Sequence, residues 1–202
     1  MENLYLIVGL GNPGAEYART RHNAGFIVAE QLAGRWHAAW KYEKRFQALV
    51  ARTEHECRSV LLCEPQTYMN ASGEAVRAVV DFFRVPIDRL LVVLDDADLP
   101  LGHLRLRPAG SHGGHHGLES VEQHLGSREY ARLRIGIGRH DGAREIAGHV
   151  LGRFRSTESA LADRVLTVAA DQAETWLAAG IQKAMNQFNG AIDDAVSEGN
   201  AQ

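Results

Sequence analysis

The segment Leu4–Gly14 constrains the fold of this chain more than any other. It begins with an apolar run, Leu4–Leu10, of the kind found in strands that are buried in a sheet. A turn rich in glycine, Gly9–Gly14, overlaps the end of this run, and a helical pattern of apolar residues starts near Asn23. A strand, a turn and a helix in this order are typical of α/β folds, which bind ligands beyond the carboxyl ends of their strands.

The apolar patterns further along the chain predict strands that alternate with helices. Strands are expected at Gln47–Arg52, Ser59–Cys63, Leu90–Leu94, His103–Arg107 (an edge strand) and Leu133–Gly138, with Thr53–Arg58 as a polar link. Helices are expected at Asn70–Phe83 with Asn70 as N-cap, at Leu118–Leu125, from Ser156 to Gly180, and once more after Gly180. The predicted fold is α/β, a single-domain mixed twisted sheet flanked by helices over residues 1–190, with a frayed tail at 191–202.

Composition is that of an ordinary globular protein. Of 202 residues, 45% are hydrophobic and 23% are charged, which is enough for one domain with a sizeable core. No apolar run reaches the length of a membrane span and no signal-peptide pattern opens the chain, so we expect a cytoplasmic protein without a membrane partner. The two cysteines, Cys57 and Cys63, are not spaced as a metal-binding pair and suit a reducing compartment.

Charge is distributed unevenly along the chain. The formal net charge is −3, yet residues 101–155 hold nine arginines against five acidic residues. Arginine is the side chain that pairs with phosphate in a bidentate manner, so this segment suits a polyanion held at one place. A solvated arginine-rich surface explains the same count, and charge alone leaves both interpretations open.

The turn Gly9–Gly14 also matches the dinucleotide-binding pattern G-x-G-x-x-G, which would indicate a nucleotide-dependent oxidoreductase. That pattern works by directing the N–H groups of a helix N-terminus at a pyrophosphate. Here Pro13 removes an N–H from the turn, and Ala15–Arg21 carries no helical stripe. These features disfavour a nucleotide cofactor. A turn without function would explain the glycines, but it would not explain Asn12 and His22.

Three polar loops follow or border the predicted strands: Asn12–His22, Glu64–Gly73 and Asp95–Asp98. If the strands are parallel neighbours, the three loops meet at one crevice, which four of the loop side chains then share: Asn12, His22, Asn70 and Asp95. An amide can polarise a carbonyl and an imidazole can take a proton from water, which suits hydrolysis of an acyl bond. No G-x-S-x-G nucleophile motif occurs, so direct attack by water is the simpler mechanism.

A metal site is the alternative for the histidine-rich loop. His112, His115 and His116 together with the aspartates of 95–98 are possible zinc ligands. His112 and His116 are four residues apart, but both precede the helix expected at Leu118–Leu125, so this is not the spacing of a helical metal site. The glycines of the loop suit close approach of the backbone to a ligand. We therefore expect no metal and no other cofactor.

Six motifs, taken together and in this order, resemble those of the bacterial peptidyl-tRNA hydrolases. They are Leu6–Gly14, Thr20–Gly25, Tyr68–Gly73, Asp98–Gly102, His112–Leu118 and Arg132–Gly138. The resemblance implies the fold of that family and an enzyme that cleaves the ester between a peptide and the 3′-terminal ribose of tRNA. Peptidyl-tRNA is then the expected partner, no cofactor is required, and the expected state is a monomer.

The resemblance also implies residue roles. His22 is expected to be the general base that activates water, Asp95 the carboxylate that supports it, and Asn12 the amide that reads the peptide part of the substrate. The residues expected to bind substrate or tRNA are Tyr17, Tyr68, Asn70, His116, Arg105 and Arg134. Arg105 lies where the family carries a basic residue near the phosphates, with Arg132 or Arg134 assisting.

One position departs from the family pattern. The family loop reads Gly-Gly-His-Asn-Gly-Leu, whereas this chain has His116 in place of the asparagine. An imidazole cannot reproduce both ends of a carboxamide, and it titrates near neutral pH. The departure keeps open a second interpretation, a non-catalytic RNA-binding relative with the same fold, although the joint presence of His22, Asn12 and Asp95 argues against it.

Overall fold

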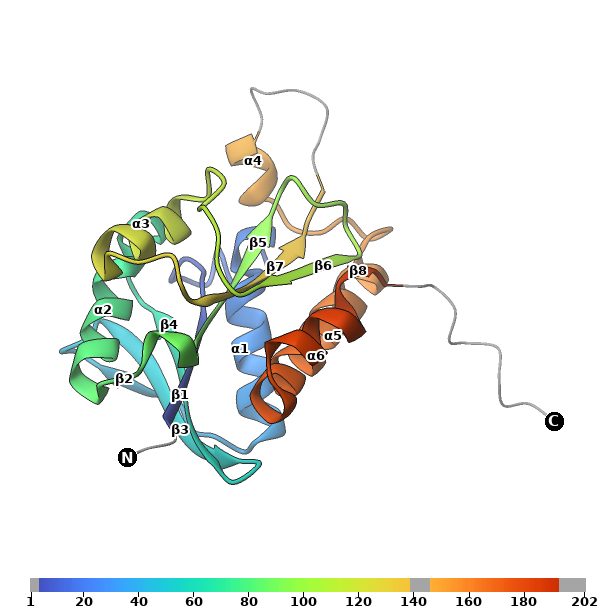
Figure 1. Ribbon diagram of the computed structural model, residues 1–202. Helices are drawn as coiled ribbons and strands as arrows, with labels where there is room; N and C mark the ends of the chain where they lie inside the picture. The colour runs from blue at the N-terminus through green and yellow to red at the C-terminus, as the bar shows by residue number, and fades with distance from the viewer. Residues whose placement is uncertain (1–3, 139–145, 193–202) are drawn as a thin grey trace.

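The computed structural model describes residues 4–138 and 146–192. Within these residues, eight strands form one twisted sheet (Figure 1). The strand order across the sheet is β2 (Lys41–Glu43), β3 (Ala48–His55), β4 (Arg58–Pro65), β1 (Leu4–Gly9), β5 (Leu90–Asp96), β7 (Ala131–Gly136), β6 (His103–Arg107) and β8 (Gly190–Ala191). The central strands β4, β1, β5 and β7 are parallel, and the outer strands on both sides are antiparallel to their neighbours. The predicted mixed α/β fold is confirmed.

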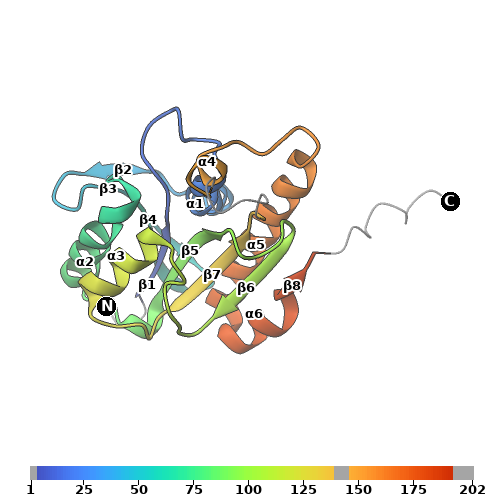
Figure 2. The same ribbon diagram turned by 90° about the horizontal axis from the view of Figure 1, so that it is seen from above.

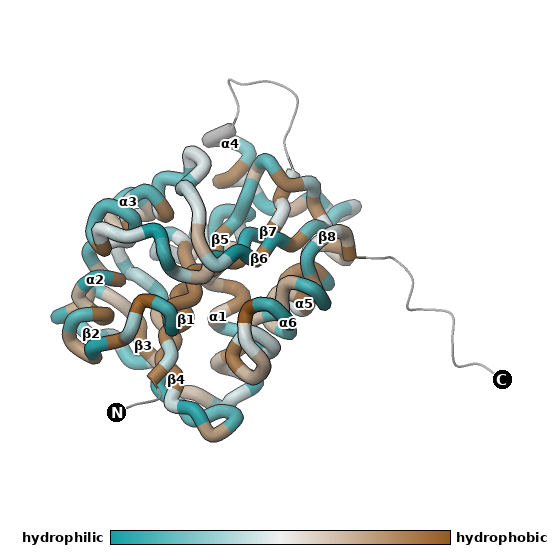
Figure 3. Tube along the Cα trace, viewed as in Figure 1, coloured by the Kyte–Doolittle hydropathy of each residue, from teal (hydrophilic) through white to brown (hydrophobic). Residues whose placement is uncertain are grey.

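Helices cover both faces of the sheet (Figures 1 and 2). One face packs on α1 (Ala24–Arg35), α5 (Ser159–Ala179) and α6 (Ile181–Phe188), and the other on α2 (Ser72–Phe83) and α3 (His116–Leu125). The short helix α4 (Ile146–Val150) lies apart from both layers, next to the 3₁₀ turn η1 (Arg21–Asn23). Strands β1 and β5 are buried on both faces, and they are apolar from Leu4 to Val8 and from Leu90 to Leu94. Strand β1 is largely brown in Figure 3.

Two glycines allow α1 to begin directly against the sheet. A Cβ atom built on Gly9 would lie 2.3 Å from the carbonyl oxygen of Gly25, and one on Gly25 would lie 2.3 Å from the carbonyl oxygen of Val93. No side chain fits at either position unless the helix moves away from β1 and β5. This close approach brings His22, which lies in η1 just before α1, to the carboxyl end of β5.

The hairpin between β3 and β4 is longer than the sequence predicts. The segment Thr53–Arg58 is expected to be a link, but β3 continues to His55 and β4 begins at Arg58. Only Glu56 and Cys57 form the turn, and both have positive φ angles, 50° and 57°. The polar residues of this segment alternate in exposure on paired strands, so their polarity reflects a solvated end of the hairpin rather than a loop.

Three other details of the predicted elements are wrong. Asn70 is not the N-cap of α2, because it lies in the 3₁₀ turn η2 (Met69–Ala71) that precedes the helix. The N-cap is Ala71, and the N–H of Ser72 donates to the carbonyl oxygen of Met69. Helix α3 begins at His116, because the ring of His115 caps its first turn. Strand β6 is not at the edge of the sheet, since the two residues of β8 pair with it.

The last described residues of the chain lie against β6. Ala191, in the predicted tail 191–202, pairs with His103, and the N–H of Ile192 donates to the carbonyl oxygen of Gly102 at 2.8 Å. The remainder of that tail lies outside the described residues. Among the helices of residues 4–138 and 146–192, none is both long and apolar enough to cross a membrane.

Candidate active site

A cavity of about 640 Å³ opens at the carboxyl ends of the central parallel strands. Its lining comes from the segments that follow β1 and β4, from the end of β5 and the two residues after it, and from β7. The loop before α3, the first residue of α3 and the end of α4 complete it. The lining residues are Asn12, His22, Tyr68, Met69, Asn70, Asp95, Asp96, Ala97, Asp98, Gly113, Gly114, His115, His116, Arg134, Val150 and Leu151. The cavity lies where an open α/β sheet is expected to hold its ligand.

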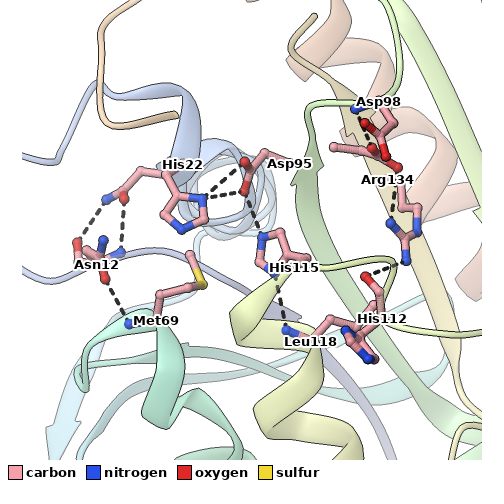
Figure 4. A network of polar contacts seen from close by, with 11 residues as sticks. Asn12, His22, Met69, Asp95, Asp98, His112, His115, Leu118 and Arg134 are labelled. Carbon is pink, nitrogen blue, oxygen red and sulfur yellow. Dashed lines mark hydrogen bonds and ion pairs between the residues drawn. The ribbon is translucent and has the colours of Figure 1, made fainter. Parts of the chain in front are cut away.

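His22 and Asp95 form the central pair of the cavity (Figure 4). Nδ1 of His22 lies 2.9 Å from Oδ1 and 3.1 Å from Oδ2 of Asp95. An ionised carboxylate only accepts hydrogen bonds, so the network assigns the hydrogen of the neutral ring to Nδ1. The lone pair of the ring is then on Nε2, and this atom can take a proton from a water molecule.

A second imidazole reaches the same carboxylate. Nε2 of His115 lies 3.0 Å from Oδ1 of Asp95, while Nδ1 of His115 accepts the N–H of Leu118 at 3.2 Å (Figure 4). The accepting role of Nδ1 places the hydrogen of His115 on Nε2, so this ring also donates to Asp95. His115 therefore caps α3 with one nitrogen and binds the carboxylate with the other.

The two histidines keep Asp95 ionised. Its side chain is almost completely buried, and burial by itself raises the pKa of a carboxyl group. Electrostatic attraction to His115 and its hydrogen bond, followed by the same interactions with His22, lower the pKa of Asp95 by more, and this pKa is held well below its usual range. Asp95 is thus an acceptor at any pH near neutral, and it can stabilise an imidazolium at His22.

Asn12 is held so that its amide nitrogen remains available. Oδ1 of Asn12 accepts the backbone N–H of Met69 at 2.8 Å. Asn23 fixes the backbone of Asn12 from both sides, with its Oδ1 accepting the N–H and its Nδ2 donating to the carbonyl, each at 2.9 Å. Within the described residues, Nδ2 of Asn12 has no acceptor, so the side chain offers a hydrogen-bond donor at the cavity.

The other predicted site residues are distributed unevenly around the cavity. Tyr68, Asn70 and His116 lie on its lining with exposed side chains, and Arg134 also lines it. Tyr17 and Arg105 are not part of the lining. Arg105 is exposed on β6, directly opposite Arg134 of β7.

Arg132, which the sequence offers as an aid in binding phosphates, is a buried structural residue. Its side chain is 1% exposed, stacks on the ring of Tyr130 at 4.4 Å, and pairs with Glu122 at 3.4 Å. It also donates to the carbonyl oxygens of Gly110 and Arg128. Arg132 is therefore not part of an anion-binding surface, and that expectation is wrong.

His22, Asp95 and His115 could together hold a metal ion, since one possible ligand atom from each lies within 4.8 Å of the others. The two nitrogens that face Asp95 carry hydrogens in the arrangement described above, so an ion would have to displace both protons. A dinucleotide has less support, because α1 begins at Ala24, well beyond Gly14, and no helix N-terminus lies at the turn.

Three comparisons with known proteins agree with this geometry. The family model of peptidyl-tRNA hydrolase matches residues 6–196. This chain belongs to the peptidyl-tRNA hydrolase family. It is 53% identical over 186 residues to the peptidyl-tRNA hydrolase of Synechococcus sp. (strain JA-3-3Ab), covering 92% of this chain and 83% of that protein. It is 46% identical over 184 residues to the enzyme of Geobacillus kaustophilus, covering 91% of this chain and 98% of the relative.

Solved structures of peptidyl-tRNA hydrolases share the fold of this family member. The crystal structure of peptidyl-tRNA hydrolase from Acinetobacter baumannii superposes with a TM-score of 0.89 at 40% identity, covering 95% of this chain and 97% of the neighbour. The resemblance inferred from the six motifs is therefore confirmed, and so is the fold that it implies.

Two residues of the site have roles that the sequence does not predict. Asn23, in the motif Thr20–Gly25, fixes the backbone of Asn12. His115, which the sequence suggests only as a possible metal ligand, donates a hydrogen bond to Asp95. Both residues lie in motifs that resemble the family pattern, and this is the signal by which the sequence could indicate a role for them. The spacing of nearby residues does not indicate the contact of Asn23 with Asn12 or that of His115 with Asp95.

Proposed function

We propose that this protein hydrolyses the ester that joins a peptide to the 3′-terminal ribose of tRNA, releasing free tRNA and the peptide. The observation that carries the proposal is the pair of His22 and Asp95 beside a free donor of Asn12 in one cavity. Membership of the peptidyl-tRNA hydrolase family supports the substrate class.

The proposed reaction is a direct attack by water. Nε2 of His22 takes a proton from water as its oxygen bonds to the ester carbonyl carbon, and the ionised Asp95 stabilises the resulting imidazolium. Nδ2 of Asn12 donates to the carbonyl oxygen as negative charge develops on it. The bond from the carbonyl carbon to the ribose oxygen then breaks, and His22 returns its proton to that oxygen. These steps use only water and side chains, without a cofactor.

Substrate contacts are proposed for the residues around the cavity. The exposed rim of Tyr68, Asn70 and His116 suits the peptidyl-adenosine end of the substrate, since an aromatic face can stack on a base. Tyr17 follows Asn12 on the same loop and is proposed to contact the same end from outside the lining. Arg105, exposed on β6, is proposed to contact phosphates of the tRNA body. We also propose a monomer as the active unit.

The test compares N-acetyl-aminoacyl-tRNA with free aminoacyl-tRNA as substrates of the wild type and of His22→Ala. We expect the wild type to hydrolyse the blocked substrate preferentially. His22→Ala should remain folded and lose about 10²–10⁴-fold in kcat, the usual contribution of a general base. A folded His22→Ala variant with the turnover of the wild type would exclude His22 as the base. A wild type that binds tRNA without releasing peptide would support the non-catalytic alternative.

A further inference from the structure

Arg21 is a buried arginine that directly precedes His22, and the proposed reaction gives it no role. Its side chain is 5% exposed, and it is not part of the cavity lining. Burial of a guanidinium is unfavourable unless the protein supplies acceptors for it. The acceptors around Arg21 therefore indicate what this side chain does.

The guanidinium of Arg21 holds the segment 152–158, which joins α4 to α5. Nη1 donates to the carbonyl oxygen of Arg153 at 2.5 Å, and Nη2 donates to Oε2 of Glu158 at 2.6 Å. The guanidinium also lies over the ring of Phe154, 5.1 Å from the ring centre. Because the side chain is so little exposed, a ligand cannot reach its remaining N–H groups.

The main chain beside Arg21 contacts the same segment. The N–H of Arg21 donates to the carbonyl oxygen of Gly152 at 3.0 Å, and Thr20 forms an isolated β-bridge to the segment. Both contacts join η1 to the near end of 152–158. The side chain of Arg21 reaches the far end at Glu158, the N-cap residue of α5. The segment is thus joined to η1 at both of its ends.

His22 lies between two fixed neighbours. On its other side Asn23 exchanges two hydrogen bonds with the backbone of Asn12, and α1 begins directly after Asn23. A single 3₁₀ turn has weak hydrogen bonds of its own, so contacts made by its outer residues decide where the middle residue lies. From this middle position the ring of His22 reaches Asp95 at 2.9 Å.

We propose that Arg21 is a positioning residue of the hydrolytic site: it fixes η1 on the segment 152–158, so that Nδ1 of His22 stays within hydrogen-bond distance of Asp95. Arg21 acts through His22 and contacts neither water nor substrate. This role rests on the proposed function for its kinetic test. Displacement of a reacting group by about 1 Å can lower a rate about 10²-fold, so a contact outside the cavity can control turnover.

Arg35 is the matched control, because it joins the opposite end of α1 to α5. Its guanidinium donates to Asp171 at 2.7 Å, to Glu174 at 2.8 Å and to the carbonyl oxygen of Thr167 at 3.3 Å. Like Arg21, it binds both carboxylate and carbonyl oxygens, but it is not near the cavity lining. Loss of packing between the two helices predicts lower activity for variants of both arginines, whereas a positioning role predicts it for Arg21 alone.

The experiment measures kcat and KM of the wild type, Arg21→Lys, Arg21→Gln, Glu158→Gln and Arg35→Gln with N-acetyl-aminoacyl-tRNA. Lysine retains the charge but lacks the planar fork that reaches a carbonyl and a carboxylate together, and glutamine removes the charge. Arg21→Gln and Glu158→Gln are also combined, so that a double-mutant cycle reports their coupling. Circular dichroism and thermal unfolding verify that every variant is folded at the assay temperature.

We expect Arg21→Gln to lower kcat by about 10- to 100-fold while KM changes by less than about twofold, because the side chain has no contact with substrate. Arg21→Lys should retain part of the lost kcat, and Arg35→Gln should retain all of it. Glu158→Gln should cause a smaller loss than Arg21→Gln and add little to it in the double variant. The proposal is overturned if folded Arg21→Gln has the kcat of the wild type, if Arg35→Gln loses as much, or if only KM changes.

A measurement without turnover separates this inference from the proposed function. In the wild type, ¹⁵N chemical shifts of His22 at a pH where the ring is neutral should report its hydrogen on Nδ1, the atom that faces Asp95. Arg21→Gln should replace this single tautomer with a mixture, as should Arg21→Lys if the glutamine variant does not fold, whereas Arg35→Gln should give the wild-type shifts. An unchanged tautomer in a folded Arg21 variant would contradict the positioning role. A wild type that does not hydrolyse the substrate would contradict only the proposed function.

Discussion

The imidazole rings of His22 and His115 lie 5.2 Å apart and both reach the same oxygen, Oδ1 of Asp95. Each ring donates one N–H, so the carboxylate fixes the tautomers of two histidines at once. His115 is held from its other side by α3, whereas the remaining nitrogen of His22 is the one that can accept a proton. Asp95 therefore orients both His22, the proposed base, and His115, a second hydrogen-bond donor.

Replacing this carboxylate by an amide should disrupt the base. Asp95→Asn offers one acceptor oxygen and an NH₂ group to two ring N–H donors. His22 can face the NH₂ group only with the lone pair on Nδ1, which places its hydrogen on Nε2, the atom that must accept the proton. We expect kcat to fall by about 10²–10⁴-fold with little change in KM. Steady-state kinetics with N-acetyl-aminoacyl-tRNA measure this.

The control for Asp95→Asn is Asp88→Asn, at an exposed aspartate in the 3₁₀ turn η3 (Ile87–Arg89), before β5 begins. It removes the same charge at the opposite end of the strand and should leave kcat unchanged. If a folded Asp95→Asn variant loses no more activity than Asp88→Asn, the carboxylate has no part in the reaction.

Arg105→Ala should weaken binding of tRNA and reduce its dependence on salt. Each phosphate contact that is lost lowers the slope of log K against log salt by about one. An N-acetyl-aminoacyl ester of adenosine, which lacks the tRNA body, should be hydrolysed as by the wild type. Binding titrations from low to moderate salt measure the slope. Arg45→Ala, which removes an exposed arginine next to β2 at the other side of the sheet, is the control and should leave the slope intact.

Glu64 should make the stability of the protein depend on pH. It is 3% exposed at the end of β4, and burial, together with the nearby charge of Glu30, raises its pKa to about 8. Between the unfolded-state pKa of about 4.3 and this value, the folded state holds a proton that the unfolded state has released. The free energy of unfolding therefore falls as the pH rises through this range.

Glu64→Gln removes the titrating group and should make the protein more stable than the wild type at pH 8, with a smaller difference at pH 5. Thermal unfolding across this range measures the effect. Glu54→Gln, at an exposed position of β3, should follow the wild type at every pH. A wild-type melting temperature that stays constant from pH 5 to pH 8 would show that Glu64 is not a buried titrating group.

The sequence was sufficient to predict the parts of the site that depend on the parallel strands. Asn12 and Asp95 follow or end two strongly apolar segments, and neighbouring parallel strands bring their carboxyl ends together. The motif containing His22 precedes a clear amphipathic helix, so its place near that edge follows from the same argument. These inferences need only that the two strands are parallel neighbours, as β1 and β5 are in the structure.

The contacts made by long loops and buried charges could not be predicted in this way. His115 reaches Asp95 from the glycine-containing loop between β6 and α3, and no periodicity describes such a loop. Arg132 is buried and Arg105 is exposed, yet both contribute equally to a charge count. A sequence gives the number of charges in a segment, whereas burial decides which of them can meet a ligand.

His116 marks the position where the chain departs from the family pattern, and its exchange for asparagine tests whether that departure affects catalysis. His116 is the first residue of α3, its side chain is 78% exposed, and Nδ1 lies 3.5 Å from Oε2 of Glu119. It lines the same cavity as His22. An imidazole gains a proton on acidification and can then only donate hydrogen bonds, and a positive charge there opposes the imidazolium that forms at His22 during the reaction.

We therefore expect His116→Asn to retain or raise the rate near neutral pH and to extend activity further toward acidic pH, because asparagine does not titrate. Profiles of kcat/KM against pH for both proteins measure this. His124→Asn, near the far end of α3, is the matched control and should give the wild-type profile, since His124 bonds to the carbonyl oxygen of Ser120 and is not part of the cavity. If His116→Asn also gives the wild-type profile, the ring of His116 points away from the reacting ester, and the departure from the family pattern is a neutral change at the rim of the cavity.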